Sequence, residues 1–221
     1  MEPVTNENCS YVLNDQERGN SMKTIVIGAT GLIGKEIVKV LAPRHEVITV
    51  GHRSGDLQVD ITSNSSIEEM YKDVGRFDAL VSAAGSAAFG MMEKLSDSDY
   101  MFGLRDKLMG QVNLVRVGID YINDNGSFTL TSGSLAHEPI PGGSAVSMVN
   151  AALNGFGMAA AIEMKRGIRL NIVSPPFATE TLKALGMDTS TGIPAAKFAA
   201  AYKESVEGKR NGEVIDVRKF A

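Results

Sequence analysis

Hydrophobic residues along this chain follow two alternating patterns: short apolar runs, and longer stretches in which they recur every three or four positions. The short runs predict buried strands at 24–27, 46–50, 57–62, 77–85, 127–132, 167–175 and 212–217. The longer stretches predict helices ending near 41, opening at 65, and spanning 98–122, 145–164 and 194–206. Strands that alternate with helices indicate a doubly wound parallel sheet of about seven strands, in three α/β/α layers.

Cap and turn residues divide this pattern further. Ser65, with Glu68 three residues later, is a candidate N-cap for the second helix. Leu104, Leu108 and later apolar residues give the helix at 98–122 a single buried stripe. The next four residues, 123–126, read Asn-Asp-Asn-Gly, and this composition predicts a tight turn before the fifth strand.

The junction between the first strand and the first helix is rich in glycine, spaced as G-x-x-G-x-x-G over 28–34. Glycine lets the chain turn tightly and lets backbone N–H groups approach a phosphate, while the helix N-terminus adds unpaired donors and a favourable dipole. Glycines also occur in ordinary strand–helix turns, but a buried strand before them and a helix after them favour a dinucleotide site in a Rossmann-type fold. The predicted cofactor contacts here come from Gly28, Thr30, Gly31, Leu32, Ile33 and Gly34.

The tip of the second strand distinguishes two dinucleotides. In a dinucleotide-binding fold this tip faces the adenosine ribose, where an acid binds a free 2′-hydroxyl and an arginine accommodates a 2′-phosphate. This chain has Arg53 and Ser54 there, and no acid before Asp56. Arginine suits a phosphate because its planar fork donates two parallel hydrogen bonds. We therefore predict NADP(H) in preference to NAD(H); the alternative is a solvated loop arginine.

Composition sets the remaining bounds. A chain of 221 residues with 43% hydrophobic and 22% charged residues suits one globular domain, assigned to 22–221, and the polar segment 1–21 is expected to be a flexible extension. A net charge of −4 gives no reason to expect nucleic acid or an anionic membrane as a partner. Cys9 is the single cysteine, no apolar run approaches ~18 residues, and no secretory signal or metal site is predicted. These features lead us to expect a cytoplasmic protein.

Two motifs resemble the short-chain dehydrogenase/reductase family. They are the glycine spacing with Thr30 inside it, and the segment 167–175, which matches G-I-R-x-N-x-V-x-P and ends at Pro175. The resemblance extends over 23–221 and implies an NAD(P)-dependent oxidoreductase. It also implies a homodimer or homotetramer, because in this family the helix equivalent to 145–164 commonly packs against its copy in another subunit.

The resemblance also implies positions for further cofactor contacts. It places Asp60 beside the adenine ring and Ile61 against it. The small residues that follow the fourth strand match the family's A-G sequence and allow the backbone to pass close to the cofactor. The predicted contacts from these and later segments are Ala83, Ala84, Gly85, Asn150 and Pro175.

The expected catalytic residues are only partly present. The family's catalytic serine matches Ser132 or Ser134, but the positions of its Tyr-x-x-x-Lys pair are held by Val146 and Asn150. Lys107 stands where the family usually has an asparagine, so lysine and asparagine have exchanged places. Lys107 is therefore a candidate for a cation near the nicotinamide ribose or for a proton relay, against the alternative of a surface lysine in a local salt bridge.

Three functions fit these residues. The first is an NADP-dependent oxidoreductase with an atypical site, acting on a small-molecule carbonyl or alcohol through Ser132 or Ser134 and Lys107. The second is a catalytically inactive NADP-binding regulatory or interaction protein, suggested by Val146 and Asn150. The third is a non-redox lyase or isomerase that uses the same cavity. A general acid contributes roughly 10²–10⁴-fold to a rate, so loss of the tyrosine need not abolish catalysis if another donor is in place. The candidates for this donor are Ser132, Ser134, Lys107 and His137.

Overall fold

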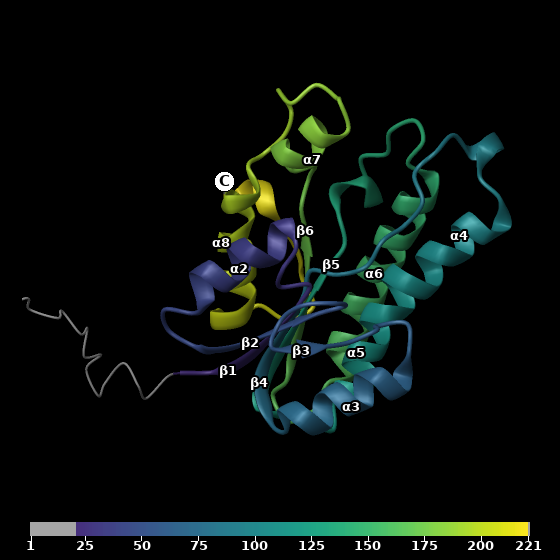
Figure 1. Cartoon of the computed structure of the whole chain (residues 1–221). Helices are drawn as coiled ribbons and strands as arrows, with labels where there is room; N and C mark the ends of the chain where they lie inside the picture. The colour runs from purple at the N-terminus through teal and green to yellow at the C-terminus, as the bar shows by residue number, and fades with distance from the viewer. Residues whose placement is uncertain (1–20, 221) are drawn as a thin grey trace, which may run out of the picture.

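β1 (Lys23–Ile27) is an interior strand of a parallel sheet in the computed structural model, which describes residues 21–220 (Figure 1). The other strands are β2 (Glu46–Gly51), β3 (Leu57–Gln58), β4 (Phe77–Ser82), β5 (Ile122–Thr131), β6 (Arg169–Ser174) and β7 (Val214–Asp216). They lie in the order β3-β2-β1-β4-β5-β6-β7, and every pairing is parallel. The predicted Rossmann-type sheet of seven strands is confirmed. The extension predicted at 1–21 lies, except for Ser21, outside the described residues.

Helices cover both faces of this sheet. The α-helices are α2 (Leu32–Leu41), α3 (Asn64–Val74), α4 (Asp97–Gly103), α5 (Gly110–Gly118), α6 (Ser144–Glu163), α7 (Thr179–Ala184) and α8 (Ala195–Glu207). The shorter turns are the π-helix η2 (Leu104–Met109) and the 3₁₀ helices η1 (Met92–Lys94), η3 (Ser134–Ala136) and η4 (Val217–Lys219). Figure 1 shows α2 and α8 together on one face of the sheet, and α3, α5 and α6 on the other.

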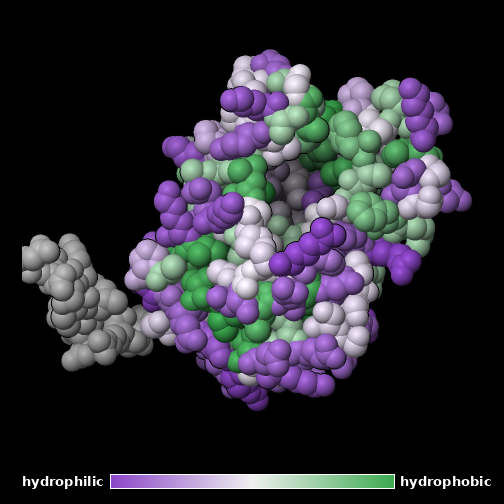
Figure 2. Space-filling model, in the orientation of Figure 1, coloured by the Kyte–Doolittle hydropathy of each residue, from purple (hydrophilic) through white to green (hydrophobic). Residues whose placement is uncertain are grey.

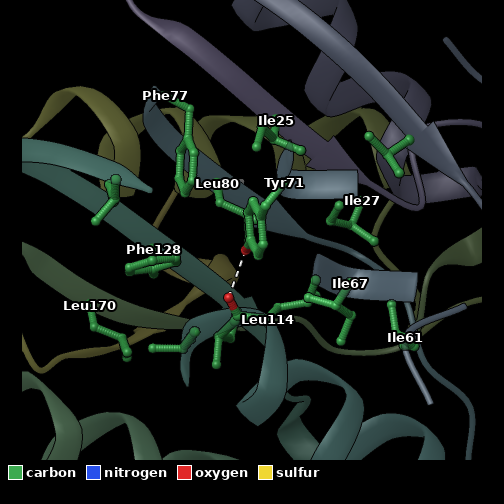
Figure 3. Close-up of a cluster of buried hydrophobic side chains, with 14 of the residues drawn as sticks. Ile25, Ile27, Ile61, Ile67, Tyr71, Phe77, Leu80, Leu114, Phe128 and Leu170 are labelled. Carbon is green, nitrogen blue, oxygen red and sulfur yellow. Dashed lines mark hydrogen bonds between the residues drawn. The ribbon is translucent and has the colours of Figure 1, made fainter. Parts of the chain in front are cut away.

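Successive residues of the strands supply two cores, one on each face. In β1, Ile25 and Ile27 join the core under α3, α5 and α6, while Val26 joins the core under α2 and α8. Figure 3 shows the first core, in which Tyr71 stacks on Phe77 and its hydroxyl donates to the Leu114 carbonyl at 2.6 Å. Because side chains alternate between the faces of a strand, a sheet buried on both sides needs the nearly continuous apolar runs seen in the sequence.

The helix predicted at 98–122 is interrupted and shorter than expected. The chain forms α4, then the π-helix η2, then α5, which ends at Gly118. The predicted turn at 123–126 lies inside β5, where the pairing with β4 shifts register and Asn125 has φ of +62°. The turn residues were therefore recognised correctly as a local break, but they form a bulge in the strand.

Two smaller predictions on the β3–α3 segment were also wrong. The N-cap of α3 is Ser63, whose side chain accepts from the Ser66 N–H, and not Ser65. The third strand ends at Gln58, because the Asp60 N–H donates to the Ser66 hydroxyl while the Asp60 carboxylate accepts from the Thr62 backbone and hydroxyl. These local hydrogen bonds turn the chain where the apolar pattern alone suggested a longer strand.

Within the described part of the chain, α6 is the one helix with the length and composition of a membrane-spanning segment. Its inner residues pack on the sheet: Val149 and Leu153 are fully buried, and a Cβ added at Gly157 would overlap the Ile172 side chain. The small and apolar residues on the inner face of α6 are thus explained by close packing on β6.

Candidate active site

The turn between β1 and α2 forms a backbone cradle. Gly28 has φ of +79°, and a Cβ added there would lie 2.7 Å from the Ala83 carbonyl oxygen. A Cβ at Gly34 would overlap the Gly28 carbonyl, so side chains are excluded on both sides of the turn. The first helical hydrogen bond runs from the Lys35 N–H to the Gly31 carbonyl, which leaves the three preceding N–H groups of α2 without helical partners. This cradle fits a pyrophosphate.

A cavity of about 520 Å³ extends from this cradle across the ends of β1, β2 and β4. Gly28, Thr30 and Gly31 line one side of it, and Asp60 and Ile61 line the other. The hydrogen bonds that Asp60 accepts from Thr62 lower the pKa of its carboxyl group, so the group is an anionic acceptor at neutral pH. This arrangement suits an adenine ring, because the Asp60 carboxylate can accept from the amino group of adenine and the Ile61 side chain can contact the ring.

The tip of β2 presents a free cation. Arg53 is exposed, and among the described residues it makes no hydrogen bond or ion pair. Ser54 donates to the Thr30 hydroxyl at 3.1 Å and so links this tip to the glycine cradle. The nearby acid, Asp56, accepts from the Thr49 N–H and hydroxyl at 2.9 and 2.7 Å and is turned back onto β2. These contacts leave a cation without a neighbouring carboxylate among the described residues at the tip of β2.

A second cavity of about 220 Å³ continues the first across the ends of β4, β5 and β6. Ala83, Ala84 and Gly85 line both cavities, so the two form one trough of the elongated shape that a dinucleotide requires. Figure 2 shows the surface hollowed between the region of α7 and the region of α4. The predicted residues that line this second cavity are Ile33, Ala83, Ala84, Gly85, Lys107, Ser132, Ser134, Asn150 and Pro175.

Lys107 is the single ionisable side chain among the described residues that line the second cavity. Its Nζ donates to the Ser132 carbonyl at 3.0 Å, and no described carboxylate lies within ion-pairing distance. Burial disfavours the charged ammonium and lowers the pKa of Lys107 to about 8. The alternative of a surface lysine in a local salt bridge is therefore wrong, and Lys107 presents an amine that can gain or lose a proton near neutral pH.

Two buried polar atoms in this cavity lack partners within the described chain. They are the Ser132 hydroxyl and the Asn150 side-chain oxygen, and both residues are at most 3% exposed. A buried polar group without a partner costs roughly 1–3 kcal/mol, and a polar group or water bound in the cavity that reached these atoms would offset this cost. Ser134 is also buried in the cavity wall, and its N–H donates to the Pro175 carbonyl at 2.9 Å. The residues present fit a nicotinamide cofactor and a polar substrate group.

The exchange of lysine and asparagine has a spatial counterpart. Lys107, from η2, and Asn150, from α6, line the same cavity, and Val146 lines it where the resemblance leads one to expect a tyrosine. His137 is exposed and does not line the cavity. The described lining residues thus include no tyrosine or histidine to serve as an acid.

Some predicted contacts lie outside the trough lining, and some lining residues were missed. Leu32, Gly34, Arg53 and Ser54 do not line either cavity; the first two offer backbone N–H groups and the last two lie at the tip of β2. Missed lining residues include Thr62, Asp106 and Phe177. None of these stands in a motif that chemistry alone would single out, since their role depends on which loops meet at the sheet edge.

Known proteins share the sequence pattern and the fold of this chain. Residues 32–221 match a family model described as Enoyl-(Acyl carrier protein) reductase. The chain belongs to the short-chain dehydrogenase/reductase family. Carbonyl reductase family member 4 of Xenopus laevis is 27% identical over 196 residues, covering 78% of this chain and 83% of its own. Such relatives are oxidoreductases, which supports an oxidoreductase role for this chain.

Two solved structures share the fold over nearly all of the described chain. The protein lin1944 from Listeria innocua is 45% identical with a TM-score of 0.86, covering 89% of this chain and 100% of its own. A small-chain dehydrogenase in complex with NADPH is 26% identical with a TM-score of 0.79, covering 89% of this chain and 96% of its own. These likenesses support binding of a nicotinamide cofactor in the short-chain dehydrogenase/reductase fold.

Proposed function

We propose that this protein is an NADP(H)-dependent oxidoreductase that transfers a hydride to or from a small-molecule carbonyl or alcohol. The observation that carries the proposal is Lys107, a partly buried amine that lines the second cavity together with Ser132 and Asn150, whose hydroxyl and side-chain oxygen have no described partner. A proton donor, a hydroxyl and an amide around one small cavity supply the proton and the hydrogen bonds that a carbonyl oxygen needs when a cofactor delivers a hydride to the carbonyl carbon.

The cofactor would lie along the trough. The glycine cradle from Gly28 to Gly34 would hold the pyrophosphate, with Asp60 and Ile61 at the adenine and Asn150 at the nicotinamide end. Arg53 and Ser54 would bind the 2′-phosphate, and the exposed, unpaired state of Arg53 supports this preference for NADP(H). When bound, NADPH supplies a hydride to the carbonyl carbon of the substrate.

Lys107 would then act as the general acid for reduction. Its ammonium donates a proton to the carbonyl oxygen as negative charge develops there, and the neutral amine regains a proton from solvent. The Ser132 hydroxyl, which has no other described partner, would hydrogen-bond the same oxygen. Ser134 remains the second candidate for this role, because its side chain lines the same cavity. In the reverse direction the neutral amine of Lys107 accepts the alcohol proton.

An alternative function is an NADP-binding regulatory protein without turnover. Val146 favours it, because an apolar side chain stands at the position where family members carry their proton donor. The two functions share the cofactor site and differ in whether Lys107 and Ser132 affect turnover.

The test measures NADPH oxidation across a panel of aldehydes, ketones and quinones, together with NADPH binding by fluorescence. Lys107→Met should lower turnover by roughly 10²–10⁴-fold while NADPH binding changes little, because the loss is of an acid. Ser132→Ala should lower turnover more than Ser134→Ala, and Lys72→Met on the exposed side of α3 is the matched control. Tight NADPH binding without turnover of any compound would instead favour the regulatory function.

A further inference from the structure

Gln111 is a fully buried amide that contacts Lys107 and Thr131, two residues that line the proposed catalytic cavity, although Gln111 does not line the cavity itself. Its Oε1 accepts from the Thr131 N–H at 2.8 Å, and its Nε2 donates to the Thr131 carbonyl at 2.9 Å. The same Nε2 approaches the Lys107 carbonyl at 3.3 Å. One side chain therefore contacts the backbone of Lys107 and the backbone of the residue before Ser132.

The sheet explains why Thr131 needs this partner. β4 pairs with β5 only as far as Val81 opposite Thr129, and β4 ends at Ser82. The Thr131 backbone lies beyond this ladder, so the Gln111 amide takes the place of a neighbouring strand. Buried backbone N–H and C=O groups without partners are costly, and a side-chain amide has the donor and acceptor that this position requires.

The helix supplies the second half of the connection. Lys107 lies in the π-helix η2, and Gln111 follows one turn later at the start of α5. π-Helical turns are often found at functional sites, because the wider turn re-aims the side chains it carries. Here the Lys107 side chain reaches across to the Ser132 carbonyl, and the only described side chain that joins η2–α5 to the Thr131 backbone is Gln111.

We infer that Gln111 is a positioning residue that holds Lys107 in register with Ser132 across the cavity. The inference rests on the proposed function, in which those two residues act on one oxygen. Its chemical content is geometric: loss of the amide removes the two hydrogen bonds that hold the Thr131 backbone to α5, so the Lys107 amine and the Ser132 hydroxyl are no longer fixed relative to each other. A misplacement of about 1 Å can cost on the order of 10²-fold in rate.

The test compares Gln111→Met, which keeps the length of the side chain and removes its hydrogen bonds, with Asn113→Met on the outer side of the same helix. Gln111→Met should lower kcat by roughly 10- to 100-fold, while KM and the Kd for NADPH change less than threefold. A second readout follows the titration of Lys107 by NMR after ¹³C-methylation of lysines. In Gln111→Met the Lys107 midpoint should move from about 8 toward the ordinary value of 10.5, because the amine gains access to water.

Each outcome supports or overturns the inference. An unchanged kcat together with an unchanged Lys107 midpoint in folded Gln111→Met would overturn it. If Gln111→Met does not fold, Gln111→Glu is measured instead, and failure of both while Asn113→Met folds would show that the amide serves the fold only. If the wild type reduces no carbonyl, the proposed function fails, whereas a shifted Lys107 midpoint in Gln111→Met would still support the positioning role.

Discussion

Lys107 carries an amine into a cavity where no described side chain balances its charge. Its neighbour Asp106 does not pair with it, because the Asp106 carboxylate accepts from the Ser86 N–H. Burial removes water from the Lys107 ammonium and no carboxylate compensates for that loss, so the pKa of Lys107 is lowered to about 8. The donor form is the ammonium, which predominates below the pKa, and the acceptor form is the neutral amine above it.

The rate of carbonyl reduction should therefore be constant below about pH 8 and fall about tenfold per unit above it, while alcohol oxidation should rise about tenfold per unit up to about pH 8 and be constant above it. Steady-state kinetics from pH 6 to 10 in both directions measure this. Lys107→Arg should lose the limb near pH 8, because a guanidinium stays protonated. A limb that persists in Lys107→Met would assign the titration to another group.

Arg53 determines the choice of cofactor in this account. Charge-assisted hydrogen bonds are worth about 1.5–3 kcal/mol, so Arg53→Ala should weaken NADPH binding roughly 10- to 100-fold. NADH lacks the 2′-phosphate and should bind Arg53→Ala and the wild type alike. Fluorescence titration of both nucleotides measures the difference, with Lys39→Ala on the exposed side of α2 as the control. Equal losses for the two cofactors would refute the 2′-phosphate role.

At the scale of elements, the sequence was sufficient to predict a helix, strand or turn where its local pattern is compatible with a single backbone conformation. Buried strands and the glycine turn were predictable because apolar runs and G-x-x-G-x-x-G each demand one backbone arrangement. The π-helix η2 could not be predicted, because one extra residue in a helical turn leaves the spacing of apolar residues, three or four positions apart, almost unchanged. The N-cap was misassigned because Ser63 and Ser65 have the same chemistry and only the turn at Asp60 distinguishes them. The role of Gln111 could not be predicted from the sequence, because Thr131, with which it forms hydrogen bonds, is distant along the chain.

The β1–α2 turn can be tested as an element. Gly28→Ala should weaken NADPH binding at least tenfold, because its Cβ would press on the Ala83 carbonyl and shift the cradle. Gly75→Ala is the matched control: Gly75 has a similar φ of +70° but nothing within 4 Å of the added Cβ. Both variants carry about 1–2 kcal/mol of backbone strain, measured by thermal unfolding. If both bind NADPH as the wild type does, the turn does not hold the cofactor.

At the scale of the whole molecule, the strand order gathers the site from distant segments. The glycine turn, Ala83–Gly85, Ser132 and Pro175 follow β1, β4, β5 and β6, so all lie at the carboxyl edge of one parallel sheet. Ligands bind at that edge in open α/β sheets, where the strand order reverses. The sequence predicted that these segments meet at one edge of the sheet, because the order of the strands follows from the fold class. It did not predict the hydrogen bond from Lys107 to the Ser132 carbonyl, because that contact depends on the geometry of the π-helix, which the hydrophobic pattern does not reveal.

The outer face of α6 is the predicted contact between copies of the chain. Ile162 is 87% exposed and Met158 is 48% exposed, and nothing lies within 4 Å of a Cβ added at Gly155. We expect a dimer or tetramer by light scattering, and Ile162→Arg should shift it to a smaller species by placing a charge in an apolar contact. Leu185→Arg, an exposed apolar residue after α7, should not. A wild type that is monomeric at micromolar concentration would contradict this contact.

A crystal structure of the protein with bound NADPH would show whether the cofactor and Lys107 meet. We expect the pyrophosphate on the N–H groups of the β1–α2 turn and the 2′-phosphate on Arg53. We also expect the reactive face of the nicotinamide ring to be open to Lys107 and Ser132, with Lys107 Nζ within about 3–4 Å of the space beside C4. A ring bound outside the cavity at the ends of β4, β5 and β6, or a Lys107 side chain turned away from it onto a carboxylate, would contradict the proposed function.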